Sequence, residues 1–185
     1  MSTKDIVNIS LFVTLLSVCA WICIPTAVPF TMQTFAVFLA MLVLGGKKGT
    51  IVIGIYLILG MIGVPVFSRG TAGPGILFGS TGGYIFGWIF IGILVIAAEM
   101  AVDRFAVKKA EYRQWILAAG MLLGLAMCYL FGTVWFMKVY TGEIEGTFGQ
   151  AVLGTCVIPF IIPDLIKMFL AFAVSKRIRK IIVNV

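Results

Sequence analysis

The chain has 185 residues, of which 62% are hydrophobic and only 11% are charged, and its mean hydropathy is +1.15. A soluble domain of this length does not carry so many apolar residues, so the composition predicts an integral membrane protein. We attribute the net charge of +7 to membrane topology and to attraction by anionic lipid rather than to nucleic-acid binding. The sequence contains no histidine, which excludes a Ser-His-Asp triad and a histidine-ligated zinc.

Long apolar runs predict six membrane-spanning helices, because a spanning backbone must satisfy its own hydrogen bonds and no alternating β-barrel pattern is seen. In chain order, the predicted spans cover residues 6–24, 31–44, 50–62, 83–102, 115–137 and 151–174. The second and third are shorter than the roughly 20 residues that a straight span needs. We expect them to extend into their loops or to lie in a thin or protein-lined environment. The expected fold class is an all-α, polytopic six-helix bundle that forms a single domain over residues 1–185.

The basic residues predict the orientation of these spans. If the spans alternate in direction, most of the 14 Lys and Arg residues fall on one side. These residues are Lys4, Lys47, Lys48, Arg104, Lys108, Lys109, Arg113, Lys176, Arg177, Arg179 and Lys180. The positive-inside rule then places both termini in the cytoplasm.

Asp164 and Lys167 are the only carboxylate and ammonium that the predicted spans place well inside the membrane. Each costs about 2.5 to 3.5 kcal/mol at a helix centre, so we interpret the pair as a functional site. At a spacing of i, i+3 they share a helix face and can reach each other or one polar ligand. Pro159 and Pro163 free backbone carbonyls nearby. The alternative is an ion pair that only staples the bundle, although such pairs add little net stability.

The predicted outer loop between the third and fourth spans, residues 63–82, is rich in Gly and Pro yet also carries large apolar residues. We expect it to fold back over the bundle and cover an outer cavity. A flexible loop at the lipid interface is the alternative. Gln33, at the outer mouth of the second span, could bond a ligand or only a neighbouring helix, and the sequence favours neither.

Several other apolar-span residues are predicted to be structural. Gly83 with Gly87, and Gly120 with Gly124, form small-xxx-small pairs that predict close helix packing. The four cysteines are predicted to be packing residues rather than disulfides or metal ligands. Glu99 is interpreted as an interfacial charge that reaches the basic loop.

Four motifs in order resemble the BioY family, the biotin-binding S components of energy-coupling factor (ECF) transporters. They are Val28-Pro-Phe-Thr-Met-Gln-Thr34, then Tyr56-Leu-x-Leu-Gly60 followed by Gly63-Val-Pro-Val-Phe67, then Ser80-Thr-Gly-Gly-Tyr84, and finally Pro159-Phe-x-x-Pro-Asp-x-x-Lys167. The resemblance implies a bundle that captures biotin at the extracellular face of a bacterial or archaeal cytoplasmic membrane. It also implies a membrane scaffold subunit (EcfT-like) and two cytoplasmic ATPases (EcfA-like) as partners.

The chain itself has no phosphate loop, so ATP hydrolysis is expected from the separate partner subunits. No nucleophile, metal set or cofactor motif accompanies Asp164 and Lys167, so no enzyme activity is expected of the chain. No cofactor is expected either, because biotin is the transported ligand. Some family members lack dedicated partners, which leaves a solitary or homo-oligomeric form open. The remaining alternatives are an S component for a different vitamin, an intramembrane enzyme with Asp164 as base, or an assembly protein.

The resemblance also implies binding residues. Asp164 would accept from the ureido N–H groups of biotin and Lys167 would donate to the ureido carbonyl, although the two polar ends of the ligand could be reversed. The other candidates are the 81–84 segment, aromatic residues around the bicycle, and polar residues for the tail. They are Thr81, Gly82, Gly83, Tyr84, Phe30, Phe67, Phe78, Gln33, Thr31 and Arg69.

S components tend to carry small alanines on the first helix where they meet the scaffold. Here that face has Ser10 and Thr14, with Ser17 one turn on. These residues are small enough for close approach but polar, so scaffold docking is a weaker expectation than ligand binding.

Overall fold

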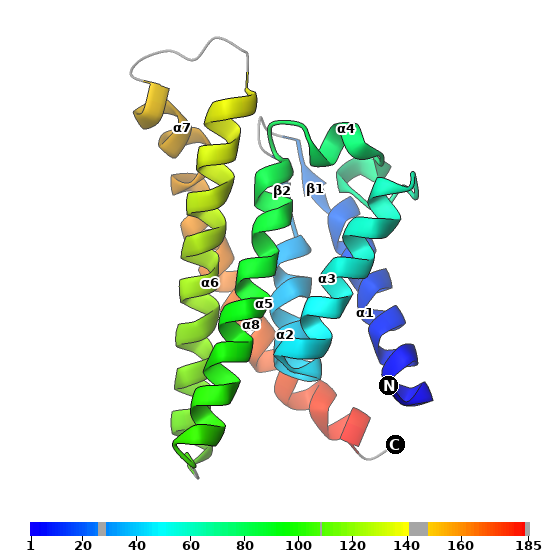
Figure 1. The fold of residues 1–185 in the computed structure, drawn as a ribbon, viewed down its shortest axis with the longest axis vertical. Coiled ribbons are helices and arrows are strands. Elements are labelled where there is room, and N and C mark those ends of the chain that lie inside the picture. Colours follow the sequence, from blue (N-terminus) through cyan, green and yellow to red (C-terminus); the bar gives the residue numbers. More distant parts are fainter. Residues whose placement is uncertain (26–28, 108, 141–147, 184–185) are drawn as a thin grey trace.

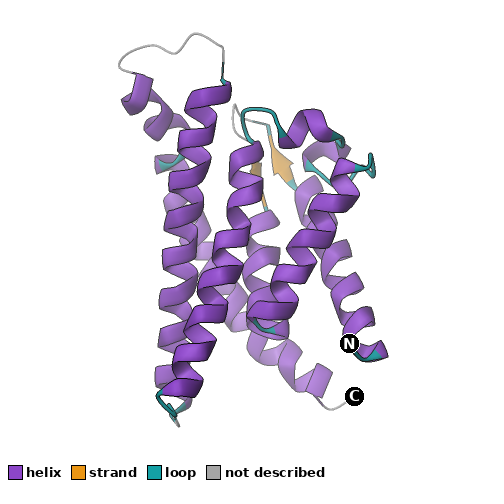
Figure 2. Cartoon of the chain, in the orientation of Figure 1, coloured by secondary structure: helices purple, strands orange, loops and turns teal. Residues whose placement is uncertain are grey.

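The computed structural model describes residues 1–25, 29–107, 109–140 and 148–183. The described chain is almost entirely helical (Figure 2). In chain order its elements are α1 (Thr3–Trp21), β1 (Cys23–Ile24), β2 (Phe30–Thr31), α2 (Gln33–Leu44), α3 (Gly46–Met61), η1 (Ser68–Gly70), α4 (Pro74–Leu77), α5 (Gly82–Arg104), α6 (Ala110–Val139), α7 (Phe148–Cys156) and α8 (Ile158–Val183).

The first five predicted spans each correspond to one helix, and the sixth falls on two consecutive helices where one was expected. The sixth span is divided at Val157 into α7 and α8. Proline has no N–H, so Pro159 cannot donate to the carbonyl of Thr155. The helix restarts with Pro159 in its first turn, where a missing donor costs little. Pro163 lies farther along, inside α8.

Within the described residues, four helical segments are long and apolar enough to cross a membrane. They are Thr3–Trp21, Gly82–Arg104, Tyr112–Val139 and Val152–Arg179. The shorter α2 has 12 residues, and every side chain from Ala36 to Leu42 is at most 5% exposed. A helix that is apolar all round and buried all round lies inside a bundle. The surroundings of α2 are therefore protein.

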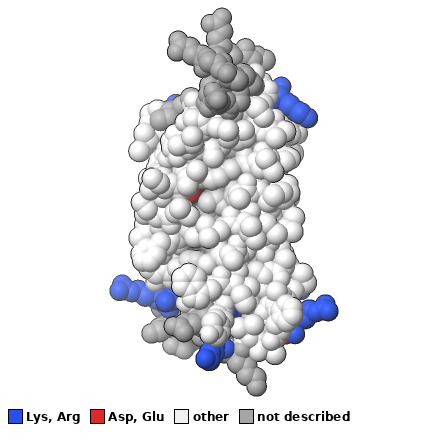
Figure 3. Space-filling view, turned by 90° about the vertical axis from the view of Figure 1, so that its left-hand side faces the viewer, with Lys and Arg blue, Asp and Glu red and all other residues white. Residues whose placement is uncertain are grey.

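The helices form one elongated bundle in which α5 packs along α6, α8 packs on α2, and α3 packs against α5 (Figure 1). Both termini lie at the same end of the bundle (Figure 1). A face of the molecule shows Lys and Arg gathered mainly at that end, with fewer at the opposite end and a broad band between them that shows only one small acidic spot (Figure 3). This band is the surface expected of a protein that sits in lipid.

Glycines set the close contact of α5 with α6. A Cβ added at Gly124 would lie 2.5 Å from the Cα of Ile91, and one at Gly87 would lie 3.1 Å from the Cα of Cys128. At Gly120 it would meet the Ala98 side chain at 2.8 Å. The predicted role of the small-xxx-small pairs in helix packing is confirmed.

The segment between α3 and α5 packs onto the end of the bundle away from the termini. Phe67 is fully buried and meets the ring of Tyr56 edge to face, with a centroid distance of 5.5 Å. Gly60 leaves the space for this ring, because a Cβ there would lie 1.9 Å from it. The indole N–H of Trp21 donates to the carbonyl of Pro65 at 3.2 Å. The segment therefore forms a fixed cover over the helices beneath it.

At the opposite end, Glu99 holds the turn between α2 and α3. Both of its carboxylate oxygens accept from the backbone N–H of Gly46, at 3.0 and 3.1 Å. Gly45 turns the chain with a φ of +84°, a conformation that favours glycine. Glu99 thus serves as an N-terminal cap of α3, supplied from α5, and not only as the interfacial charge that was expected.

Candidate ligand-binding cavity

A cavity lies inside the bundle, beneath the cover formed by the α3–α5 segment. The cavity volume that water centres can occupy is about 90 Å³. This is room for more than a single water molecule. Its walls come from β2, α2, α5, α6, α7 and α8, and from η1 and α4 of the cover. The lining residues are Pro29, Thr31, Gln33, Thr34, Ser68, Ile76, Thr81, Tyr84, Ile85, Trp88, Leu125, Cys128, Tyr129, Cys156, Phe160, Asp164 and Lys167.

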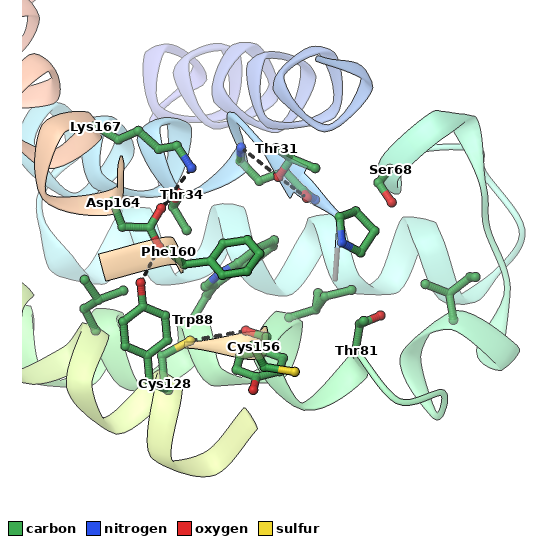
Figure 4. Close-up of a pocket in the computed structure, with 17 residues that line it drawn as sticks. Thr31, Thr34, Ser68, Thr81, Trp88, Cys128, Cys156, Phe160, Asp164 and Lys167 are labelled. Atoms are coloured by element: carbon green, nitrogen blue, oxygen red, sulfur yellow. Dashed lines mark hydrogen bonds and ion pairs between the residues drawn. The ribbon is translucent and has the colours of Figure 1, made fainter. Parts of the chain in front are cut away.

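Asp164 lies at one end of this cavity and receives three hydrogen bonds (Figure 4). Its Oδ1 accepts from Lys167 Nζ at 2.8 Å and from Thr34 Oγ1 at 2.8 Å. Its Oδ2 accepts from the hydroxyl of Tyr129 at 2.7 Å. The donors come from α8, α2 and α6, so the carboxylate joins three helices. Such charge-assisted bonds are stronger than neutral ones and offset part of the cost of burying the charge.

Lys167 is also almost fully buried, with 4% of its surface exposed. Its Nζ lies 4.1 Å from the ring centroid of Phe30, within the range of a cation–π contact. Phe30 in turn lies 5.8 Å, centroid to centroid, from Phe160. An ammonium has three N–H donors, and among the described residues Lys167 donates one hydrogen bond, to Asp164. Lys167 therefore keeps donor capacity for an acceptor in the cavity.

A second polar group lines the cavity through Thr31 and Gln33. The hydroxyl of Thr31 donates to Gln33 Oε1 at 2.7 Å, and Gln33 Nε2 donates to the hydroxyl of Tyr56 at 2.6 Å. Tyr56 donates onward to the carbonyl of Val66 at 2.8 Å. Gln33 thus both contacts a neighbouring helix and borders the cavity. An amide NH₂ has a second N–H, which it can offer to a ligand.

The remaining wall is mainly apolar. It is formed by Ile85, Trp88 and Leu125, together with the thiols of Cys128 and Cys156. The Cys128 thiol donates to the carbonyl of Tyr84 at 3.4 Å. All four cysteines are described and free, so the prediction that they form no disulfide is confirmed. Trp88 is 5% exposed and packs in the core as well as lining the cavity.

Known proteins match the chain over nearly its full length. Residues 1–184 match the profile of the BioY family. The chain belongs to the BioY family. A Thermotoga maritima relative named biotin transporter BioY is 36% identical over 179 residues, covering 96% of this chain and 97% of the relative. A Pyrococcus horikoshii relative named probable biotin transporter BioY is 36% identical over 181 residues, covering 97% of this chain and 98% of the relative.

The fold of this BioY family member also matches a solved structure. The crystal structure of the S-component for biotin from an ECF-type ABC transporter superimposes with a TM-score of 0.78 and 23% sequence identity. The match covers 97% of this chain and 95% of that chain. The helical bundle described above is therefore the fold of that S-component.

Around the cavity of this BioY family member, the structure brings together only part of the predicted set. Thr31, Gln33, Thr81, Tyr84, Asp164 and Lys167 line the cavity. Phe30 does not line it but lies against Lys167. Figure 4 shows Asp164 and Lys167 at one end of the cavity, with Ser68 and Thr81 at the other and Trp88 between them.

The other predicted residues lie away from the cavity. Phe67 fills the core beneath the cover, whereas Phe78 is 56% exposed and contacts Phe86 at a centroid distance of 6.3 Å. Arg69 is exposed in η1, with a φ of +58°. Gly82 and Gly83 are packing positions at the start of α5. A Cβ at these two glycines would lie 1.7 Å from the Leu77 carbonyl oxygen and 2.3 Å from Trp135 Cβ, respectively.

Sequence reasoning missed several lining residues. Thr34 and Phe160 both lie within motifs that carried the resemblance, so the motifs could have pointed to them. Tyr129 lies in the middle of α6, where a phenol group needs a hydrogen-bond partner if it is buried. The need for a partner could have marked Tyr129 as a candidate, but its partner, Asp164, is 35 residues away in the sequence.

The predicted docking residues on α1 of this BioY family member do not share one surface. Ser10 and Thr14 are exposed, and the hydroxyl of Thr14 donates to the carbonyl of Ser10 at 3.0 Å. Ser17 is buried and donates to the carbonyl of Val13 at 2.9 Å. A partner at this face would therefore meet Ser10 and Thr14, and the Thr14 hydroxyl is already donated to the helix backbone.

Proposed function

We propose that this member of the BioY family binds biotin in the cavity beside Asp164 and works as the substrate-specific subunit of an ECF-type transporter. The observation that carries the proposal is the buried Asp164–Lys167 pair at the end of an otherwise largely apolar cavity. Buried charges in a membrane bundle are costly, and this pair borders space for a ligand. The full-length similarity to biotin transporters of this family supports the choice of ligand.

The chemistry of biotin suits the two ends of the cavity. A ureido ring presents N–H donors and a carbonyl acceptor. Asp164 would accept a hydrogen bond from a ureido N–H, and Lys167 would donate one to the ureido carbonyl. The apolar bicycle would lie against Trp88 and the neighbouring aliphatic wall. The polar tail would then point toward Ser68 and Thr81, at the end covered by the α3–α5 segment. Thr31 and Gln33 border the space between these ends.

The transport arrangement follows from the family and the charge pattern. We infer six spans, with α2 and α3 as the short ones and α7 with α8 as the sixth, and both termini in the cytoplasm. The cavity then opens toward the extracellular side. A membrane scaffold subunit and two cytoplasmic ATPases would supply the energy, because the chain carries no phosphate loop of its own. The exposed Ser10 and Thr14 are the proposed contact with the scaffold, and a homo-oligomeric form is a second arrangement.

Titration of biotin into the purified chain, by calorimetry or with radiolabel, tests the function. We expect saturable binding that is weakened at least about tenfold in Asp164→Asn and in Lys167→Met, because each variant removes a charge-assisted contact. Asp103→Asn is the matched control, because Asp103 is exposed near the C-terminal end of α5. Absence of saturable binding by the wild-type chain would overturn the biotin proposal. Unchanged binding by both cavity variants would instead relocate the site, and competition by another vitamin would reassign the ligand.

A further inference from the structure

Asp164 has little acceptor capacity left for a ligand. A carboxylate offers about four lone-pair positions, and three donors already occupy Asp164. Lys167 and Thr34 both donate to Oδ1, and Tyr129 donates to Oδ2. One position on Oδ2 remains. The expectation that Asp164 accepts from both ureido N–H groups therefore requires more acceptors than this arrangement leaves.

The geometry of a cyclic urea leads to the same conclusion. The two N–H groups of a five-membered ureido ring point away from each other, on opposite sides of the carbonyl. One carboxylate oxygen cannot lie in line with both. An N–H and the adjacent C=O do lie along one edge of the ring. A donor and an acceptor placed next to each other, as Lys167 Nζ and Asp164 are at 2.8 Å, match that edge.

We propose that Asp164 and Lys167 recognise one N–H/C=O edge of the ureido ring, and that Tyr129 restricts them to that edge by occupying an acceptor position of Asp164. This inference rests on the proposed function. Tyr129 is a positioning residue here: its hydroxyl fixes which lone pair of Asp164 faces the cavity. Thr34, on the other oxygen, prevents a second N–H from binding there.

The second ureido N–H must then meet a weaker acceptor. Among the described residues that line the cavity, Asp164 is the only carboxylate, so the other acceptors there are neutral hydroxyl, amide, thiol or carbonyl groups. A hydrogen bond to a charged group is worth about 1.5 to 3 kcal/mol, against about 0.5 to 1.5 kcal/mol for a neutral one. The two N–H groups of the ligand are therefore unequal in the bound state.

Two cyclic carbamate analogues of biotin test this inequality, each with an oxygen in place of one ureido N–H. Oxygen is no larger than N–H, so the substitution removes a donor without adding bulk. We expect the two analogues to differ in affinity at least about tenfold, because only one of them loses the charged contact. Equal losses for the two analogues would overturn the inference.

The Tyr129→Phe variant tests the role of the hydroxyl. Biotin affinity should fall, and the affinity ratio between the two carbamates should move toward one, because the freed carboxylate can turn to either N–H. A purely structural role for Tyr129 would lower all affinities in proportion and leave this ratio unchanged, which would overturn the positioning role. Tyr112→Phe, exposed near the start of α6, is the matched control. Biotin itself is titrated first, and absence of binding would overturn the proposed function. If biotin binds but the two carbamates lose affinity equally, only this inference is overturned.

Discussion

Two carboxylates in this bundle, Asp164 and Glu99, are held by very different groups. Glu99 binds the backbone N–H of Gly46 with both oxygens, at 3.0 and 3.1 Å. Asp164 is held entirely by side chains, which come from three helices. Glu99 closes a turn and borders a helix end. Asp164 borders a cavity.

The contrast shows what distinguishes a functional charge from a structural one: Asp164 is 3% exposed, and Glu99 is half-buried. Both carboxylates have hydrogen-bond partners, so the presence of partners does not by itself tell a functional carboxylate from a structural one. A backbone partner that caps a helix uses the charge for the fold itself. Side-chain partners that leave one acceptor position of a cavity-lining carboxylate unoccupied keep that carboxylate available to a ligand. Substitutions at the two sites should therefore change stability and ligand affinity in different proportions.

The largest effect is expected from Lys167→Met. This change leaves Asp164 buried without its counter-charge, and breaking a buried pair in this way costs about 3 to 5 kcal/mol of folding free energy. Asp164→Asn combined with Lys167→Met removes both charges and should regain most of that loss. Thermal unfolding of the detergent-purified variants measures both effects. A single variant as stable as the wild type would mean that the ion pair does not hold α8 against α2 and α6.

Glu99→Gln should show the opposite pattern. The amide keeps one acceptor oxygen but loses the charge at the N-terminus of α3, which we expect to cost about 0.5 to 2 kcal/mol of stability. Biotin affinity should stay at the wild-type value, because Glu99 is not among the residues that line the cavity. Thermal unfolding and biotin titration on the same preparation test the two statements. A fall in affinity without a fall in stability would contradict the assignment of Glu99 to the fold.

The helices and the Asp164–Lys167 pair could be predicted because both are local features of the sequence. Apolar runs identify helices, and two charges within one such run stand out. The shortness of α2 left a protein environment as one of three possibilities, beside extension into its loops and a thin membrane region. The break at Val157 was missed, although Pro159 and Pro163 were noted, because proline near a helix start and proline that divides a helix look alike in sequence.

The rest of the site depends on the path of the chain in space. Thr34 and Asp164 are 130 residues apart, and no local pattern joins them. Phe67 and Phe78 lie in the same glycine-rich segment and were given the same role. Only the course of that segment decides that one ring fills the space left by Gly60 while the other is exposed. Sequence pattern predicted the anchor of the site, and tertiary contacts decide which side chains surround it.

A smaller effect is expected from Thr34→Val, which keeps the shape of the side chain and removes one donor to Asp164 Oδ1. Lys167 still donates to the same oxygen, so the carboxylate stays paired. We expect biotin affinity to fall about threefold to tenfold, the value of one hydrogen bond. Thr3→Val, at an exposed position at the start of α1, is the matched control. An affinity equal to wild type would show that Thr34 does not help to position Asp164.

The smallest effect is expected at Lys48, which forms the second ion pair among the described side chains. Lys48 joins α3 to Asp5 on α1, and the two side chains are 42% and 22% exposed. Pairs exposed to this extent are worth about 0 to 1 kcal/mol and weaken with salt. Lys48→Met is the cleaner change, because Asp5 also caps α1 by accepting from the N–H of Ser2 at 3.1 Å.

Lys48→Met and Lys167→Met are the same chemical change in two ion pairs that differ in burial. If burial determines the cost, Lys48→Met should lower the unfolding temperature only slightly, and the difference from wild type should shrink further in high salt. The loss in Lys167→Met should be larger and nearly independent of salt, since buried pairs are screened much less. Thermal unfolding of both variants at low and high salt compares them directly. Equal losses at the two lysines would mean that the cost follows the loss of a positive charge and not the burial of its partner, and the contrast between the two ends of the bundle would fail.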